Sequence, residues 1–243
     1  ALFETVKAVG IELCPALGLT IPVGKDSLSM RTDWVENGTN KSVVAPLSLI
    51  ISGFAPVVDV TQSVTPQLVK EDDTSLVFMD LSGGKTRMGG SALAQVHGQL
   101  GDDTPDLDDP ETLKQFFKVV QQWINDGKIL AYHDRSDGGL FTTIAEMCFA
   151  GRIGAKLTIE PTLEKLFNEE LGAVIQVRNE DLKGMIDEMP TVQVIGTVHD
   201  NPILSIGDES FDVYELLQFW SQTSYQIQKL RDNPDTADAE FKL

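Results

Sequence analysis

Basic residues are scarce in this sequence of 243 residues. Only 19 lysines and arginines stand against 37 aspartates and glutamates, which gives a formal net charge of −18. Proteins that bind nucleic acid or an anionic membrane surface need a concentration of positive charge. We therefore expect neither nucleic acid nor a membrane among the partners, and the acidity alone is typical of a well-solvated surface.

Cysteine and histidine are equally sparse. Cys14 and Cys148 lie far apart and form no Cys-x-x-Cys pair, so we expect two buried free thiols in a reducing cytoplasm. The histidines, His97, His133 and His199, are widely separated, which argues against a zinc site. No Gly-x-Ser-x-Gly motif is present, so the chain offers no serine nucleophile elbow.

Long apolar runs are absent as well. The longest candidate, 43–58, contains Pro46, Gly53 and Pro56 and falls short of the roughly 18 to 20 residues of a membrane span. It predicts one or two buried strands. The N-terminus begins at Ala1 without an initiator methionine or a basic segment, so we expect no signal peptide and an origin within a longer chain.

The first part of the chain predicts a helix followed by β structure. Apolar residues recur at helical spacing over 2–17, and Gly18 is a suitable C-cap. A short strand is expected over 19–23, a hairpin turn at Asn37-Gly38, and β structure over 42–60. The composition then turns polar over 61–73, which indicates a boundary between two subdomains.

From residue 75 onward, strands and helices alternate, which predicts an α/β arrangement with mixed strand directions. The clearest helix covers 110–126, with Asp109 as N-cap and Pro110 at its first position. Strands are predicted over 75–81, 129–132, 155–159, 172–177, 191–199 and 202–206, the last two paired with each other, and helices over 140–150, 162–168, 181–188 and 210–231; residues 133–139 are expected to form a loop and 232–243 a polar tail.

The segment 21–30, Ile-Pro-Val-Gly-Lys-Asp-Ser-Leu-Ser-Met, is the first that suggests chemistry. Gly24 lets the backbone approach a ligand, and Lys25 is a mobile cation suited to phosphate. Asp26 could orient that lysine or a metal, and Ser27 and Ser29 offer hydroxyls. The spaced glycines of a Walker A loop are missing. An ordinary exposed turn is the alternative.

The segment 131–140 is the second, and it lies between a predicted strand and a predicted helix. Ligand sites of α/β proteins occur at such positions. Asp134 and Asp137 provide carboxylates of the kind that Mg²⁺ prefers, and the helix N-terminus after Gly138-Gly139 would present free N–H groups to an anion. The alternative is a surface charge cluster in which Asp137 caps the helix.

Two further features are weaker. His133 could serve as a general base, although no nucleophile accompanies it. The glycine pairs Gly83-Gly84 and Gly89-Gly90 could form an anion-binding turn around Lys85, and a tight structural loop is the interpretation that we favour.

Residues 21–30 and the sequence His-Asp-Arg-Ser-Asp-Gly-Gly-Leu at 133–140 resemble the second synthetase repeat of the large, single-chain phosphoribosylformylglycinamidine synthases of bacteria. The second motif is shared by the wider superfamily of aminoimidazole ribonucleotide synthetase-like enzymes that use ATP. The first motif is more specific to the synthases. The resemblance covers essentially the whole chain.

The resemblance implies a fold of two subdomains. Residues 1–65 would be the later part of a β-rich synthetase subdomain, and 70–231 a complete α/β subdomain of the aminoimidazole ribonucleotide synthetase-like fold. Residues 232–243 would be a linker toward a glutaminase domain. The first synthetase repeat and the glutaminase domain of the same polypeptide would be partners of this chain.

The resemblance also implies an activity. Such enzymes convert formylglycinamide ribonucleotide, glutamine and ATP to formylglycinamidine ribonucleotide in purine biosynthesis. Asp134 would bind Mg²⁺ and Ser136 would contact ATP or ADP at an auxiliary site, with Lys25 and Ser27 facing a ligand. Because a composite site is incomplete in one repeat, we expect the isolated fragment to be inactive.

Two alternatives stay open at this point. One is a free-standing ATP enzyme of the same superfamily, although such enzymes need an acidic, glycine-rich segment ahead of the first helix. The other is a non-enzymatic pairing or scaffold module, which an exposed β edge would favour.

Overall fold

The computed structural model describes residues 1–25, 27 and 30–242. The chain divides into two compact units. The first comprises Ala1–Val60 with Asp109–Phe116, and the second comprises Thr61–Asp108 with Phe117–Leu243. Within the described residues, no helix is both long and apolar enough to cross a membrane.

The first unit begins with one continuous helical stretch, as predicted. It consists of α1 (Leu2–Val6), the π-helical η1 (Lys7–Leu13) and α2 (Cys14–Leu17). Gly18 ends it in the left-handed conformation, with a φ of 74°. The amide of Leu19 donates to the carbonyl of Cys14, 2.8 Å away, so the predicted glycine C-cap is confirmed.

A β-hairpin follows in the same unit. Strands β1 (Arg31–Glu36) and β2 (Thr39–Val44) pair antiparallel, and Glu36 faces Thr39 across the turn. Asn37 and Gly38 have φ values of 50° and 77°, which is the positive-φ pair that a tight hairpin turn requires. The hairpin prediction is therefore confirmed.

The strand predicted over 19–23 and the β structure predicted beyond Val44 are wrong. Residues 19–23 and 45–59 form no strand, and only the short 3₁₀ turn η2 (Val60–Gln62) follows the hairpin. Ile50, Phe54 and Val58 are exposed rather than buried. An apolar run becomes a strand only where a neighbouring strand receives its hydrogen bonds, and no strand of the described residues pairs with this one.

The second unit is built on a mixed seven-stranded sheet with the order β4-β6-β3-β7-β5-β8-β9. Its strands are β3 (Thr74–Asp80), β4 (Ile129–Asp134), β5 (Gly154–Leu157), β6 (Gly172–Arg178), β7 (Val192–His199), β8 (Ile203–Ile206) and β9 (Glu209–Asp212). All neighbours are antiparallel except β5 and β8. The strands β7 and β8, predicted to pair with each other, instead lie on either side of β5.

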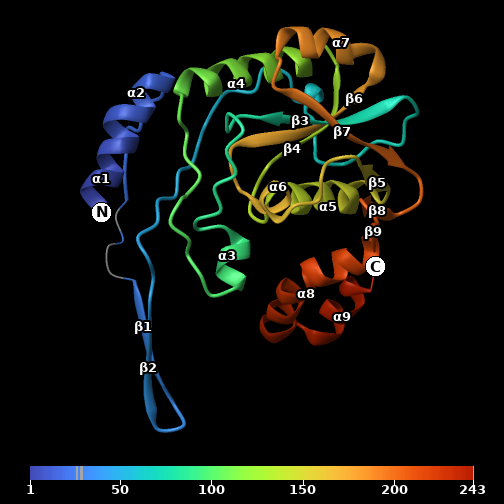
Figure 1. Cartoon of the computed structure of the whole chain (residues 1–243). Coiled ribbons are helices and arrows are strands. Elements are labelled where there is room, and N and C mark those ends of the chain that lie inside the picture. Colours follow the sequence, from blue (N-terminus) through green and yellow to red (C-terminus); the bar gives the residue numbers. More distant parts are fainter. Residues whose placement is uncertain (26, 28–29, 243) are drawn as a thin grey trace. The chain divides into compact units, whose positions relative to one another are not determined.

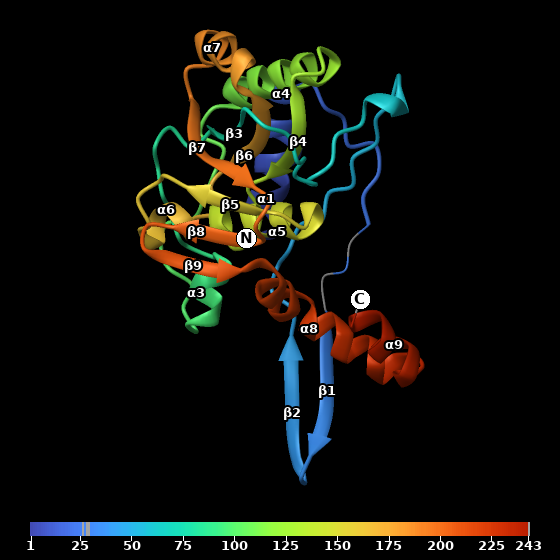
Figure 2. The same ribbon diagram turned by 90° about the vertical axis from the view of Figure 1, so that its right-hand side faces the viewer.

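Helices cover both faces of this sheet (Figures 1 and 2). The C-terminal part of α4 (Pro110–Asn125) and α7 (Asn179–Glu188) lie on one face, where Trp123 donates to Glu188 over 2.8 Å. The other face carries α5 (Gly139–Gly151) and α6 (Leu163–Phe167), with α8 (Val213–Arg231) against α5. The predicted α/β arrangement with mixed strand directions is thereby confirmed.

The alternation of β3 explains the two-sided core. Its residues from Thr74 to Met79 are all buried, because successive side chains point to opposite faces of a covered sheet. Leu76 and Phe78 pack with Ile144 and Cys148 of α5. Cys148 is buried as predicted, which raises its pKa to about 12, whereas Cys14 is only half-buried.

The end of one strand and the structure of the polar tail differ from expectation. Strand β4 continues through His133 and Asp134, which were predicted to lie in a loop. The polar tail contains α9 (Pro234–Phe241), capped by Asn233 and attached to α8 by stacking of Phe241 on Tyr225, with ring centroids 4.0 Å apart. A single aromatic residue in a polar segment gives little helical pattern, which is why this helix was missed.

Candidate functional site

Asp134 is the last residue of β4, an edge strand of the sheet, and its side chain is exposed. The hydroxyl of Tyr132 donates to Asp134 Oδ1 over 2.5 Å. Burial, followed by the neighbouring Asp134 carboxylate, raises the pKa of Tyr132. The hydroxyl of Ser136 donates to the carbonyl of Asp134 over 3.0 Å, so the strand end and the turn form one local structure.

The turn into α5 is held by hydrogen bonds of two glycine amides. The amide of Gly138 donates to Glu169 Oε1 over 2.7 Å, and that of Gly139 to the carbonyl of Ser136 over 2.9 Å. The amides of Gly138 and Gly139 are therefore engaged within the protein, whereas the expectation that the helix N-terminus after them presents N–H groups to an anion stays a prediction. Asp137 does not cap the helix, since the N-cap is Gly138 and makes no side-chain cap.

Glu169 connects this turn to a second element. The same Oε1 atom accepts from the amide of Ala92 over 2.8 Å, at the start of α3 (Ala92–Val96). One carboxylate oxygen thus fixes the β4–α5 turn to α3. Sequence reasoning missed Glu169 because its partners lie 31 and 77 residues away.

Arg135, noted as part of the charge cluster at 133–137, is a structural residue. It is buried beside Asp80, with Nη2 3.2 Å from Oδ1, and its guanidinium lies 4.8 Å from the ring centroid of Phe78. It also donates to the carbonyls of Glu170 and Leu171. Desolvation lowers the pKa of Arg135 in spite of the Asp80 charge.

His133 is likewise engaged. Its Nε2 lies 2.9 Å from Glu146 Oε2, and the other oxygen of Glu146 accepts from the indole of Trp220 over 2.7 Å. This chain of contacts joins β4, α5 and α8. The geometry gives His133 a packing role and does not place a nucleophile beside it.

The two glycine pairs after β3 behave differently. Gly89 lies against the backbone of Asp103, where an added Cβ would come within 2.6 Å of the carbonyl oxygen. Gly83 and Gly84 have φ values of 64° and 84°, with open space where their Cβ atoms would be. The tight-loop interpretation therefore applies to the second pair, while the first pair exposes its backbone.

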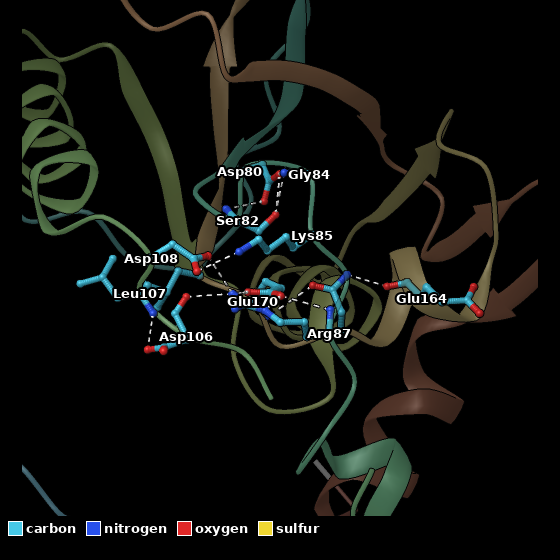
Figure 3. A network of polar contacts seen from close by, with 12 residues as sticks. Asp80, Ser82, Gly84, Lys85, Arg87, Asp106, Leu107, Asp108, Glu164 and Glu170 are labelled. Carbon is cyan, nitrogen blue, oxygen red and sulfur yellow. Dashed lines mark hydrogen bonds and ion pairs between the residues drawn. The ribbon is translucent and has the colours of Figure 1, made fainter. Parts of the chain in front are cut away.

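A network of ion pairs holds the loop that contains both pairs (Figure 3). Arg87 pairs with the buried Glu170, Nε to Oε1, over 2.5 Å, and also with Asp108 over 3.2 Å. Lys85 reaches Asp108 over 2.8 Å. Burial alone would raise the pKa of Glu170, but its hydrogen bonds and charge interaction with Arg87 outweigh burial and lower it.

A pocket of about 170 Å³ lies beside this network. It combines apolar side chains with amide and charged groups from the ends of β3, α5, α6 and β7. Its lining residues are Phe78, Asp80, Gly84, Lys85, Thr86, Arg135, Leu140, Ile159, Lys165, Asn168, Gln193 and Ile195. A hollow of about 480 Å³ along the hairpin of the first unit is an open face of a two-stranded ribbon whose residues are all exposed.

The other predicted ligand residues belong to the first unit. Lys25 Nζ donates to Ser27 Oγ, so these two side chains lie together. Asp26 and Ser29 lie outside the described residues. Asp134 and Ser136 belong to the second unit.

A divalent metal would find a partial set of ligands here. The described part of the chain holds no group of three or more His, Cys, Asp or Glu side chains arranged for a metal. Mg²⁺, however, is bound by one or two carboxylates with phosphate oxygens and waters. The exposed carboxylate of Asp134 fits one of those positions.

Comparison with known proteins agrees with this architecture. Residues 80–209, more than half of the chain, match the model of the AIR synthase related protein, C-terminal domain, and residues 1–56 match that of the FGAR-AT PurM_N-like domain. The two matched stretches follow one another along the chain without overlap.

Three solved structures from Thermotoga maritima show a similar fold. The PurL complexed with FGAR aligns with a TM-score of 0.51 and 13% identity over 73% of this chain and 30% of its own. PurLQS aligns with a TM-score of 0.50 and 15% identity over 64% of this chain and 28% of its own. Phosphoribosylformylglycinamidine synthase II aligns with a TM-score of 0.50 and 14% identity over 73% of this chain and 28% of its own. This chain thus spans less than a third of their length. The α/β sheet unit has the AIR synthase-like fold, and the chain belongs to the family of AIR synthase related proteins.

Proposed function

We propose that this chain is one synthetase repeat of a phosphoribosylformylglycinamidine synthase of the large, single-chain form, an ATP-dependent ligase of purine biosynthesis with glutamine as the nitrogen donor. The order of the two family matches along the chain carries this proposal, because residues 1–56 match a domain of the FGAR amidotransferases in particular. A relative with a similar fold is PurL complexed with FGAR, which supports the same substrate class.

The contribution of the second unit would be a half-site for Mg²⁺ and ATP or ADP. Asp134 would hold the metal, and Ser136 would contact the nucleotide. The exposure of both side chains at the end of β4 supports these roles, as does the turn that fixes them through Glu169. Bound Mg²⁺ would neutralise phosphate charge, which is the main task in phosphoryl transfer.

Lys25 and Ser27 would face a ligand from the first unit. Their mutual hydrogen bond supports a joint role, because a lysine held by a hydroxyl has a defined direction. An ammonium group and a hydroxyl together suit a phosphate or a polar substrate group. The proposal for these two side chains is therefore contact with a group of this kind.

The remaining synthetase repeat and the glutaminase domain would be partners in the same cytoplasmic polypeptide. A chain that spans less than a third of the relatives' length would leave the composite site incomplete. We therefore expect no turnover of FGAR, glutamine and ATP by residues 1–243 alone. Turnover by this chain would contradict the proposed division of the site.

Calorimetric titration with Mg·ADP tests the half-site. The variants are Asp134→Ala and, as a matched control for loss of an exposed carboxylate, Asp187→Ala on α7. In the full-length enzyme we expect Asp134→Ala to weaken Mg·ADP binding by at least about tenfold, since it removes a charged metal ligand. Equal weakening by Asp187→Ala, or none by Asp134→Ala, would contradict the assignment of Asp134.

A further inference from the structure

Tyr132 and Asp134 lie on the same face of β4. Successive side chains of a strand point to opposite faces, so residues two apart are neighbours on one face. His133, between them, points to the other face, where its ring contacts Glu146 of α5. The hydroxyl of Tyr132 reaches Oδ1 of Asp134 over 2.5 Å. This contact connects the exposed candidate metal ligand to a side chain that is itself partly buried.

The backbone of this segment is fixed on both sides. Tyr132 pairs with β6, and its amide donates to the carbonyl of Thr65 over 3.0 Å. Although β4 is the outermost strand of the sheet, its outer edge is therefore held at Tyr132 as well. The carbonyl of Asp134 accepts from the hydroxyls of Ser136 over 3.0 Å and Thr143 over 3.3 Å. The main chain at Asp134 is thus held, and the direction of its carboxylate is what a neighbour still has to set.

The carboxylate of Asp134 takes its direction from the phenol. The last torsion angle of an aspartate is soft, so an exposed carboxylate turns readily unless a neighbour holds it. A phenol keeps its proton up to roughly pH 10, so at neutral pH Tyr132 donates and Asp134 accepts. Within the described part of the chain, Oδ1 accepts this hydrogen bond and none to Oδ2 is observed. The contact therefore holds one oxygen and leaves the other able to bind a cation.

We propose that Tyr132 is a positioning residue for Mg²⁺ at Asp134. This inference rests on the proposed role of Asp134 as a metal ligand and deepens it. The hydroxyl holds the carboxylate in one orientation before the metal arrives, so less conformational freedom is lost on binding. Groups that hydrogen-bond a metal ligand in this way tune metal affinity without touching the metal.

A titration that varies Mg²⁺ tests the role of the hydroxyl. ADP is titrated calorimetrically into the full-length enzyme at a series of Mg²⁺ concentrations, which gives the concentration that produces half of the gain in ADP affinity. Tyr132→Phe removes the hydroxyl and keeps the ring. We expect it to raise that Mg²⁺ concentration by about tenfold, because the carboxylate loses its fixed direction. ADP affinity without Mg²⁺ is expected to stay unchanged.

Tyr225→Phe is the matched control. The hydroxyl of Tyr225 donates to Asp238 over 2.6 Å, so the variant removes a tyrosine–aspartate contact of the same kind where α8 meets α9. Its Mg²⁺ response is expected to equal that of the wild type. A shift as large as that of Tyr132→Phe would show that the effect is not local to Asp134 and would overturn the proposal.

A double variant separates positioning from a purely structural role. In the Asp134→Ala background there is no carboxylate to orient, so adding Tyr132→Phe should change Mg·ADP affinity by less than about twofold. Two losses that add in full would mean that the hydroxyl acts elsewhere, which contradicts the proposal. Urea unfolding of Tyr132→Phe completes the comparison: lower stability with a wild-type Mg²⁺ response would reduce the contact to a support of the strand end and rule out positioning.

The same titrations distinguish failure of this inference from failure of the proposed function. A strong effect of Asp134→Ala with a wild-type Mg²⁺ response in Tyr132→Phe overturns the role of Tyr132 and leaves the metal at Asp134. No effect of Asp134→Ala overturns the metal ligand itself, and the role of Tyr132 with it.

Discussion

Arg87 and Glu170 form a two-pronged ion pair, with Nε 2.5 Å from Oε1 and Nη2 2.7 Å from Oε2. The Glu170 side chain is 0% exposed, and the Arg87 amide donates to the same carboxylate over 3.1 Å. These contacts tie the loop after β3 to the segment that precedes β6. The same segment contains Glu169, which accepts from the amide of Gly138 in the β4–α5 turn, and Asn168, which lines the pocket.

Removal of Glu170 is expected to destabilise the second unit strongly. Glu170→Ala removes the buried, two-pronged partner of Arg87 and leaves only the half-exposed Asp108, so we expect the free energy of unfolding to fall by about 2 kcal/mol or more. Urea unfolding monitored by circular dichroism measures the change in the free energy of unfolding. Glu160→Ala, which removes an exposed partner of Lys165, is the control and should stay close to the wild type. Equal stability of the two variants would contradict the structural role of Glu170.

The same pair makes stability depend on pH. The pKa of Glu170 is lower in the folded protein than its ordinary value of 4.5, so the unfolded state binds protons more readily. This contribution to stability is fully present above pH 4.5 and is lost as the pH falls through the lower, folded pKa. We therefore expect the stability difference between wild type and Glu170→Gln to narrow below about pH 4. A difference that stays constant from pH 7 to the acid limit would contradict this linkage.

Glu169 offers a test of how the β4–α5 turn is held. Glu169→Ala removes the acceptor shared by the amides of Gly138 and Ala92, whereas Glu169→Gln keeps an oxygen in place. We expect hydrogen exchange at those two amides to accelerate by about tenfold in the alanine variant and much less in the glutamine variant. Equal exchange in both variants would show that the turn is held by other contacts.

Many of the helices and turns were predictable because their signals are local. The apolar spacing of 110–126 and the cap at Asp109 predicted α4 to within a residue, and Asn37-Gly38 predicted the hairpin. Strand order and partners depend on contacts far apart in sequence. For that reason β9 and the position of β5 between β7 and β8 were not foreseen.

The candidate site likewise contains residues that the sequence predicted and residues that only the structure shows. Asp134 and Ser136 stand in a recognisable motif, so the sequence alone pointed to the end of β4. The residues that shape the surroundings have no motif of their own. Arg87 and Glu170 are 83 residues apart, and only the folded chain shows that they meet. The exposed apolar run at 45–59 shows the opposite failure, in which a strong local pattern lacks the neighbour that would make it a strand.

Gly139 provides the sharpest steric test of the site. It has a φ of 70°, and an added Cβ would lie 2.7 Å from the backbone oxygens of Leu166 and Asn168. Backbone atoms cannot yield as a flexible side chain can, so Gly139→Ala forces the β4–α5 turn away from α6. We expect it to lower the unfolding free energy by about 2 kcal/mol or more and to weaken Mg·ADP binding, because Ser136 moves with the turn.

Gly184 is the matched control for that variant. It lies within helix α7, and no atom lies within 4 Å of its Cβ position. Gly184→Ala should stabilise the protein by about 0.5 to 1 kcal/mol, since alanine restricts the unfolded chain and favours the helix. Thermal unfolding of both variants decides the matter. If Gly139→Ala is as stable as Gly184→Ala, the turn must have room that the structure does not show, and the rigid placement of Ser136 would be contradicted.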